Sequence, residues 1–256
     1  MASTERFGYE WDKYSYIDQK YEDQLENWLG PIKKEYFEDK TILDAGCGMG
    51  RNSYWSLKWG ARKLTAFDFD HRSVNRAKET LKEFGDKAEV LYKSIYDINW
   101  KNSFDIVFSI GVIHHLKDYE KALNNLYQSL KPGGKMIVWV YGREGNEWIV
   151  RLVDPIRKNI TSKLPLPIVH FLSYFCSIPL YFFVKIFRGP SGYLKQISSF
   201  KFKHIHSIVF DQLIPEVANY WPKQEINEIF SKINGIKDFS INRPKNNLGW
   251  TIVCNK

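Results

Sequence analysis

A glycine-rich loop with an acid in front of it follows a short, largely apolar run near the start of the chain. Residues 41–43 lead into Asp44, and glycines follow at the alternate positions Gly46, Gly48 and Gly50. Glycine accepts positive φ angles and lets a ligand lie against the main chain, so the pattern is typical of a nucleotide-type loop between a strand and a helix. The dinucleotide pattern G-x-G-x-x-G would need a third glycine where Arg51 stands, and Asp44 would repel a pyrophosphate. The loop therefore favours a ligand that carries positive charge.

A second acid occupies the end of the next predicted strand. Residues 63–67 form that strand, and Asp68, Phe69 and Asp70 follow it before a helical pattern begins. The tip of the second strand is where a ribose diol is held in folds of this kind, and Asp68 is the residue at that tip. Asp70 stands at the position of a helix N-cap, and this is the role we expect for it.

These motifs, in this order over residues 40–142, resemble those of class I S-adenosylmethionine-dependent methyltransferases. The resemblance rests on the glycine loop, the strand-end Asp68 and the stretches 104–116 and 130–135. It implies a doubly wound, Rossmann-like α/β fold with a seven-stranded sheet that is mostly parallel and has an antiparallel last strand. It also implies S-adenosyl-L-methionine as cofactor and S-adenosyl-L-homocysteine as product. Residues 7–11 and 211–222 are further similar to small-molecule and glycan-biosynthetic members of the superfamily.

The resemblance also implies which residues bind the cofactor. They come from the N-terminal segment, the loop and the ends of the first four strands: Trp11, Asp44, Gly46, Cys47, Gly48, Gly50, Asp68, Phe69, Ser94, Ile95, Ser109 and Ile110. In the family an aspartate after the third strand often contacts the adenine; the matching position here is Ser94, with Asp97 three residues further on, and either could make that contact. Trp11 and Tyr14 either cover the cofactor or belong to the core.

Five residues are candidates for binding the methyl acceptor or removing its proton. Methyl transfer from a sulfonium is an in-line displacement, and a general base contributes about 10² to 10⁴-fold when the acceptor is a hydroxyl or a protonated amine. His114 follows the fourth strand, and Tyr141 and Arg143 follow the fifth. Tyr141 could orient an acceptor, and Arg143 suits a carboxylate or phosphate. Asp211 and Tyr220 return from the next segment and could complete the pocket.

Histidines and cysteines elsewhere in the chain have plainer interpretations. A catalytic role and a structural role are equally supported for His114, whereas for His115 we favour a structural hydrogen bond. His204 and His206 are interpreted as part of a solvated face and not as metal ligands. The cysteines are scattered and include no CxxC pair, which argues against a disulfide framework and a zinc site; they are Cys47, Cys176 and Cys254.

The chain is predicted to divide into three parts. Residues 1–38 form a helical N-terminal segment that covers the cofactor, with a helix at about 17–37. Residues 39–143 and 221–256 form the methyltransferase core. Residues 144–220 interrupt the alternation of strands and helices and form a helical, basic and aromatic lid inserted after the fifth strand.

The centre of this insertion carries no charge for 21 residues, from Leu164 to Val184, between Lys163 and Lys185. Such a length would reach across a bilayer as a helix, but three prolines and the absence of other spans argue against a transmembrane segment. We favour a helical lid whose apolar face packs over the active site or on a second subunit. An in-plane amphipathic anchor, with residues 164–187 in peripheral contact with a membrane, is the alternative.

The positive charge of the chain is concentrated in the same region. The formal net charge is +8, and residues 151–210 contain nine Lys or Arg against one acid. Such a surface attracts an anionic or amphiphilic acceptor. We therefore predict methyl transfer to an O or N atom of a small-molecule, sugar, or phosphate- or lipid-linked acceptor, by a monomer or homodimer.

Two other functions stay open. An RNA (tRNA) methyltransferase gains support from a pI near 9.2, although no recognisable RNA-binding module accompanies it and nucleic acid is the less favoured partner. A membrane-peripheral, partner-binding protein with a purely structural cofactor site is the third hypothesis. The first 30 residues contain no apolar run typical of a signal peptide, which predicts a cytoplasmic protein, with contact to the inner face of the membrane if residues 164–187 form an anchor.

Overall fold

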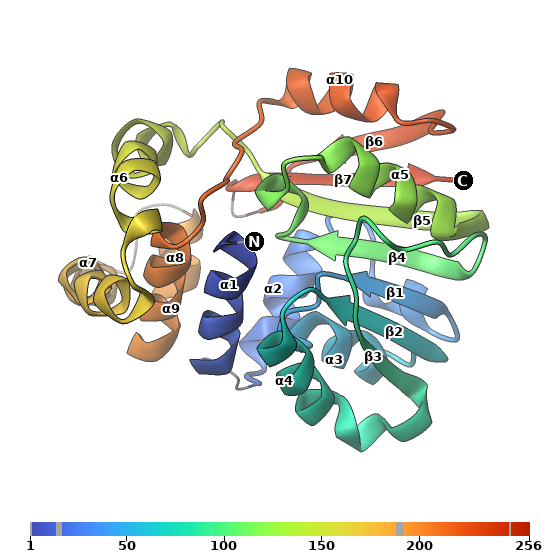
Figure 1. The fold of residues 1–256 in the computed structure, drawn as a ribbon, viewed down its shortest axis with the longest axis horizontal. Coiled ribbons are helices and arrows are strands. Elements are labelled where there is room, and N and C mark those ends of the chain that lie inside the picture. Colours follow the sequence, from blue (N-terminus) through green and yellow to red (C-terminus); the bar gives the residue numbers. More distant parts are fainter. Residues whose placement is uncertain (1, 14–16, 188–191, 246) are drawn as a thin grey trace.

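The computed structural model describes residues 2–13, 17–187, 192–245 and 247–256. Its centre is a seven-stranded sheet in the order β3-β2-β1-β4-β5-β7-β6 (Figure 1). Strands β1 to β5 are parallel to one another, and β7 is antiparallel to both β5 and β6. The strands are β1 Thr41–Ala45, β2 Lys63–Asp68, β3 Ala88–Tyr92, β4 Phe104–Ile110, β5 Leu130–Tyr141, β6 Asp238–Asn242 and β7 Gly249–Asn255. The predicted fold class is confirmed.

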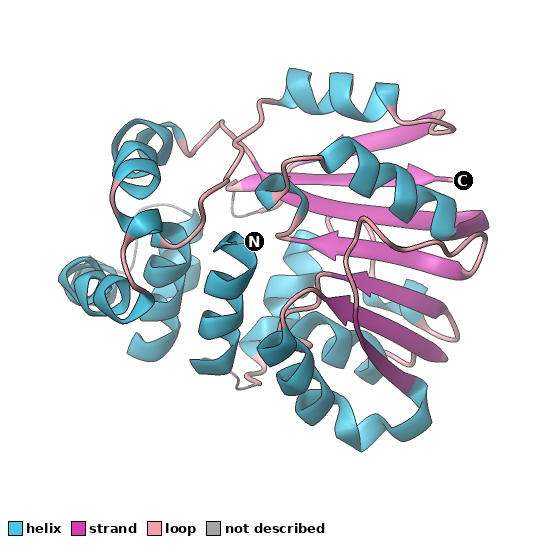
Figure 2. Cartoon of the chain, viewed as in Figure 1, coloured by secondary structure: helices cyan, strands magenta, loops and turns pink. Residues whose placement is uncertain are grey.

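Helices cover both faces of the sheet because the central strands are apolar on both sides (Figure 2). Leu43 and Val107 face α5 (Tyr119–Ser129) and α10 (Lys223–Lys232). Ile42 and Ile106 face the opposite layer, which contains α2 (Lys20–Trp28), α3 (Arg51–Lys58) and α4 (His71–Leu81). The short helices η1 (Lys34–Phe37), η2 (Lys82–Lys87) and η3 (Ile113–His115) connect these elements.

The N-terminal region differs from the single helix expected at 17–37. Helix α2 ends at Trp28, Gly30 has a φ of 63°, and the short helix η1 follows only at Lys34. Proline cannot continue a helix that needs its N–H, so Gly30 and Pro31 separate two short helices. Ahead of them, α1 (Ala2–Lys13) lies across the carboxyl ends of the parallel strands (Figure 1).

Strand β5 starts at Leu130, directly after α5, and contains an irregularity near its start. Leu130 pairs with Phe104, and the register then shifts before Lys135 pairs with Ile106. The residues between them, including Gly133 with a φ of 78°, form a bulge. The glycines therefore lie in a bulge within β5 and do not mark the start of the strand.

Six helices follow β5 and lie beyond α1, on the side of the carboxyl ends (Figure 1). They are η4 (Ile149–Val153), α6 (Asp154–Asn159), η5 (Thr161–Lys163), α7 (Leu166–Phe187), α8 (Gly192–Ser198) and α9 (Phe202–Leu213). We call these elements the lid helices. Helix α7 buries Val169, Ser173, Ser177 and Val184, and α9 lies alongside it.

Candidate active site

The glycine loop between β1 and α3 has the left-handed backbone that its composition predicts. Gly46, Gly48 and Gly50 have φ angles of 78°, 54° and 82°. A Cβ atom on Gly46 would lie 2.5 Å from the side chain of Val112, and one on Gly48 would lie 2.9 Å from the ring of Trp11. Both the backbone angles and these close approaches require glycine, so the bare main chain of the loop faces the covering elements.

Two buried carboxylates stand on either side of this loop. Ser53 Oγ donates a 2.6 Å hydrogen bond to Asp44, and the main-chain N–H groups of Gly48 and Asp70 donate to Asp68 at 2.9 and 3.0 Å. Burial raises the pKa of Asp44 to about 7, with a further contribution from the charge of Asp68, and burial raises the pKa of Asp68 to about 6. A positively charged ligand would favour the ionised form of both. The charge of S-adenosylmethionine, a sulfonium with an ammonium group, fits this pair.

Asp70 is the N-cap of α4, as predicted. Its carboxylate accepts hydrogen bonds from the N–H groups of Arg72 at 2.8 Å and Ser73 at 3.2 Å. Gly8 of α1 packs so closely on this carboxylate that a Cβ atom there would clash with it. The cap therefore also determines where α1 crosses the core.

Helix α1 covers the loop through Trp11. The guanidinium of Arg51, at the start of α3, lies 5.5 Å from the Trp11 ring, 4.4 Å from the Tyr21 ring and 5.7 Å from the Trp28 ring. Trp11 thus lies over the glycine loop, and its contact with the cofactor stays a prediction; Tyr14 lies outside the described residues. Arg51 has no distinctive spacing beyond the glycine loop, so its position in the sequence does not indicate these ring contacts.

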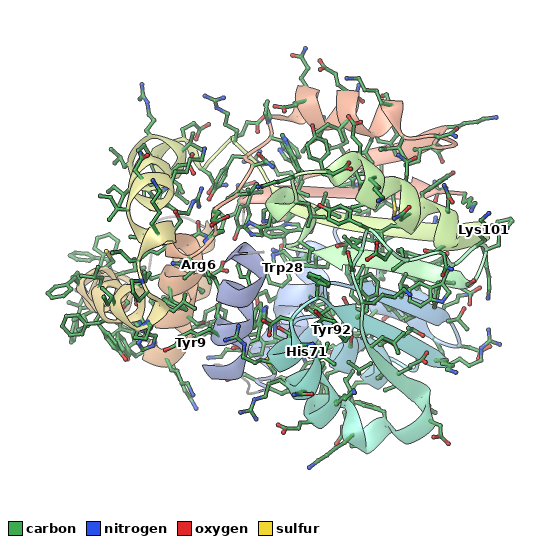
Figure 3. The ribbon with its side chains drawn as sticks, in the orientation of Figure 1. Arg6, Tyr9, Trp28, His71, Tyr92 and Lys101 are labelled. Carbon is green, nitrogen blue, oxygen red and sulfur yellow. The ribbon has the colours of Figure 1, made fainter. Side chains whose placement is uncertain are left out.

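The residues expected near the adenine lie on one rim of the site. Phe69 is 44% exposed and stacks on Tyr92 with ring centroids 5.4 Å apart, and Tyr92 stacks in turn on His71 at 3.7 Å (Figure 3). Ser94 Oγ accepts a hydrogen bond from the N–H of Tyr96 at 3.1 Å, while the side chain of Ile95 belongs to the core. Asp97 is exposed.

Three further predicted cofactor residues are buried beneath the loop. Ser109 Oγ donates to the carbonyl of Ala45 at 2.9 Å and so joins the ends of β4 and β1. Ile110 and Cys47 pack in the core, and burial raises the pKa of the Cys47 thiol well above its usual value. Their side chains therefore support the loop from below.

A chain of hydrogen bonds links the end of β5 to the lid helices. Tyr141 donates to Asp211 at 3.2 Å and accepts from Gln212 at 3.0 Å, and Tyr220 donates to Gln212 at 3.0 Å. The buried Arg157 contacts the Tyr220 hydroxyl at 3.5 Å and forms an ion pair with Asp154. We call Tyr141, Asp211, Gln212 and Tyr220 the polar cluster.

Glu10 of α1 joins this cluster from the opposite side. It is 3% exposed and forms a side-chain hydrogen bond with Asp211. Burial, followed by the negative charge of Asp211, raises the pKa of Glu10 well above its usual value. Burial also raises the pKa of Asp211, but hydrogen bonds from Glu10 and Tyr141 oppose that rise. Glu10 is therefore the protonated acid of the pair, and Asp211 is the carboxylate.

His114 lies against the polar cluster. It is fully buried, its ring centroid lies 3.9 Å from that of Tyr141, and neither ring nitrogen has a hydrogen-bond partner in the structure. Burial lowers its pKa well below the usual value, so the imidazole is neutral at pH 7. His115 differs, because its Nδ1 is 2.7 Å from the carbonyl of Val217. This is a structural contact of the kind expected for His115.

Arg143 stands apart from the other four predicted acceptor-site residues. Strand β5 ends at Tyr141, and the chain then turns, so the alternation of a strand no longer directs Arg143 inward. Its main-chain N–H donates to the carbonyl of Trp221 at 3.1 Å, and its side chain is exposed beside Glu147 and Arg151. The structure brings together His114, Tyr141, Asp211 and Tyr220 without it.

The prediction of a solvated face for His204 and His206 is wrong, because both side chains are buried. His206 Nδ1 lies 2.8 Å from Ser177 Oγ, and the His204 ring stacks on Phe200 with centroids 3.8 Å apart. These contacts arise because α9 packs along α7, which the charge pattern alone does not reveal. Among the residues described, no three metal-ligating side chains converge.

Comparison with known proteins finds a family model and relatives that match part of the core. Residues 42–134 match the family model described as a methyltransferase domain. A tRNA U34 carboxymethyltransferase of Helicobacter acinonychis is 36% identical over 106 residues, which are 40% of this chain and 40% of that protein. Phosphoethanolamine N-methyltransferase 2 of Caenorhabditis elegans is 33% identical over 107 residues, 41% of this chain and 24% of that protein. The chain thus matches 40% or less of the length of either relative.

A solved structure extends the likeness to most of the fold. The magnesium protoporphyrin IX methyltransferase of Synechocystis PCC 6803, which was crystallised with S-adenosylhomocysteine, has a TM-score of 0.55 at 11% sequence identity. The match covers 93% of this chain and 84% of that one. At this identity the likeness concerns the fold.

Proposed function

We propose that this chain, whose core is a class I S-adenosylmethionine-dependent methyltransferase domain, methylates an O or N atom of a small, anionic or amphiphilic acceptor. S-adenosylmethionine is the cofactor of this domain and supplies an electrophilic methyl group on a positively charged sulfur. One observation carries the proposal for the acceptor: buried polar groups without partners lie under α1 and the lid helices. They are Glu10 Oε2 and both ring nitrogens of His114.

The polar cluster provides a place for the proton of the acceptor. Hydrogen bonds from Tyr141 and Glu10 oppose the rise in the pKa of Asp211 that desolvation causes, and so favour its carboxylate form. A hydroxyl or ammonium group bound beside Tyr141 could transfer its proton to Asp211 or to the neutral ring of His114. Tyr220 and Gln212 hold the Tyr141 hydroxyl in orientation through their hydrogen bonds. Enclosure by α1 and the lid helices excludes water, as methyl transfer requires.

The second candidate is a tRNA substrate. The relative from Helicobacter acinonychis named above acts on tRNA, and exposed lysines and arginines cover the lid helices. An enzyme that modifies a nucleobase must admit the base into a buried pocket and bind the flanking strand outside it. The closed arrangement of α1 over the site favours the small acceptor.

Methyl labelling separates the two candidates. Purified protein would be incubated with S-adenosylmethionine labelled in its methyl group, and either with bulk tRNA or with a set of small hydroxyl- and amine-bearing molecules with and without phosphate or an alkyl chain. We expect label in the small-molecule fraction, highest for the anionic and amphiphilic members. Label in tRNA alone would establish the second candidate instead.

A further inference from the structure

The lid helices concentrate nearly all of the large apolar side chains that the molecule exposes. Of the 15 exposed large hydrophobic residues in the described part of the chain, 13 lie between positions 148 and 187. The other two, Phe69 and Tyr92, stack at the rim of the active site. Monomeric proteins rarely expose a contiguous apolar surface of this kind without a binding partner for it.

Helix α7 provides the main part of this surface. Phe171, Phe175, Phe182 and Ile186 recur along one side of the helix and are 58 to 68% exposed. Its opposite side is buried against α9, where Ser173 and Ser177 contact His206. In Figure 3 the side chains of α7 project outward, away from the sheet. Within the described part of the chain, the side of the helix that carries these four residues thus stays exposed.

Helix α7 is long and apolar enough to cross a membrane, with a mean hydropathy of 1.6 over its most apolar window. Crossing would require separating it from α9 and breaking the hydrogen bond between Ser177 and His206. A buried polar group without a partner is costly, so the packed arrangement favours a helix that lies along a surface. Prolines near the N-terminus of the helix and at Pro179 agree with that arrangement.

The charged residues around the apolar surface are almost all positive. Arg151, Lys158, Lys163, Lys185 and Lys195 are exposed on the same helices. The single acid of residues 151–210 is Asp154, which already pairs with Arg157 and Lys158. Two copies of the chain meeting face to face would bring these like charges together, whereas anionic lipid headgroups complement them.

We propose that the exposed side of the lid helices docks onto the surface of an anionic lipid bilayer. The aromatic side chains of α7 enter the boundary between headgroups and acyl chains, and the surrounding lysines and arginines contact lipid phosphates. The helix lies parallel to the membrane plane and does not cross it. This inference concerns binding alone and does not depend on the identity of the methyl acceptor.

Co-sedimentation of the full chain with vesicles tests the proposal. Vesicles of phosphatidylcholine alone would be compared with vesicles containing about one third phosphatidylglycerol, at low and high salt. We expect the protein to sediment with the anionic vesicles, and binding to weaken as salt screens the basic residues. Protein that stays in the supernatant with both compositions at low salt would overturn the proposal.

Paired variants identify the surface responsible. The double variant Phe175→Glu/Phe182→Glu should bind anionic vesicles at least about tenfold more weakly, because charged groups replace two inserted rings. Phe175→Leu/Phe182→Leu keeps an apolar surface and should bind close to the parent. Lys82→Gln/Lys87→Gln, on the exposed helix η2, lowers the net charge by the same two units and controls for a general change of charge. Calorimetric binding of S-adenosylhomocysteine should be equal in all four proteins, which verifies folding.

Light scattering tests whether a second copy of the chain, and not a lipid bilayer, covers this surface. We expect the parent protein to be monomeric without lipid at micromolar concentration. A dimer that Phe175→Glu/Phe182→Glu dissociates, together with unchanged vesicle binding by that variant, would assign the surface to a second copy of the chain and overturn the proposal.

Discussion

The proposed cofactor side and the proposed acceptor side of the site differ in which parts of the chain form them. The cofactor side consists of main chain and strand ends within residues 41–70, where glycines with positive φ and two strand-end carboxylates occupy consecutive elements of the sheet. The acceptor side consists of side chains from four distant segments: Glu10 from α1, His114 after β4, Tyr141 at the end of β5, and Asp211 from the lid helices. The cofactor side is formed by residues close together in the sequence. The acceptor side forms only after α1 and the lid helices have docked.

This difference means that the two functions can be altered independently. Substitutions on the acceptor side should change the rate of methyl transfer and leave cofactor affinity intact, and substitutions in the loop should do the reverse. The four changes below test that separation, beginning with the largest expected effect.

Asp211→Asn should lower the rate of methyl transfer by about 10² to 10⁴-fold, because an amide cannot take up the acceptor's proton. Calorimetry with S-adenosylhomocysteine should show unchanged affinity. Glu147→Gln, which alters an exposed carboxylate after β5, is the control and should retain full activity. Full activity in Asp211→Asn would remove this residue from the role of general base.

Gly46→Ala should weaken cofactor binding by about 100-fold, since it adds both an unfavourable φ of 78° and a close contact with Val112. Gly133→Ala is a matched control, because Gly133 has the same φ of 78° and open space at its Cβ position. That variant should lose about 1 kcal/mol of unfolding free energy with unchanged affinity. Equal affinities in the two variants would show that the loop does not approach the cofactor.

Asp68→Ala should weaken cofactor binding by about 1 to 3 kcal/mol, as measured by calorimetry, because a charged hydrogen-bond acceptor is lost. Asp70→Ala provides the comparison two residues away. It should mainly lower thermal stability, by about 0.5 to 2 kcal/mol, through loss of the α4 cap. If Asp70→Ala had the larger effect on affinity, the assignment of Asp68 to the ribose would be wrong.

Cofactor affinity should also depend on pH; between pH 8 and pH 7 the fall is about twofold, which is the smallest of the four effects. Burial raises the pKa of Asp44 to about 7 and that of Asp68 to about 6 in the free protein, and a bound cation would favour their ionised forms. Affinity for S-adenosylmethionine should therefore be highest above pH 7 and fall as pH drops through 7 and 6, by up to about tenfold per unit for each proton taken up. In Asp44→Asn the fall near pH 7 should disappear; a flat profile in the parent protein would contradict the interpretation.

The sequence predicted the parts of the molecule that are encoded locally. The loop, the cap at Asp70 and the strands that end at Asp44 and Asp68 follow from glycine spacing, acids at strand ends and apolar runs. The contacts of Glu10 and Arg51 could not be predicted, because they form only when α1 folds back over α3. No periodicity in the sequence indicates that packing. The burial of His204 and His206 could not be predicted for a related reason. The spacing of histidines does not show which helix packs against them. Arg143 is exposed although it follows the fifth strand, because the chain turns directly after Tyr141.

One arginine connects the two sides of the site mechanically. Arg6 of α1 donates hydrogen bonds to the carbonyls of Ile214 at 2.7 Å, Leu164 at 3.1 Å and Thr161 at 2.7 Å, and Figure 3 shows it on the side of α1 that faces the lid helices. Any outward displacement of those helices must either break all three bonds or carry α1 with it. If α1 moves with the lid helices, Trp11 leaves Gly48 and Asp211 leaves Tyr141 in the same step, whereas Glu10 stays beside Asp211. With the roles proposed above, uncovering the cofactor and dismantling the polar cluster would then be a single event, and the cofactor could not exchange while the acceptor side remained assembled.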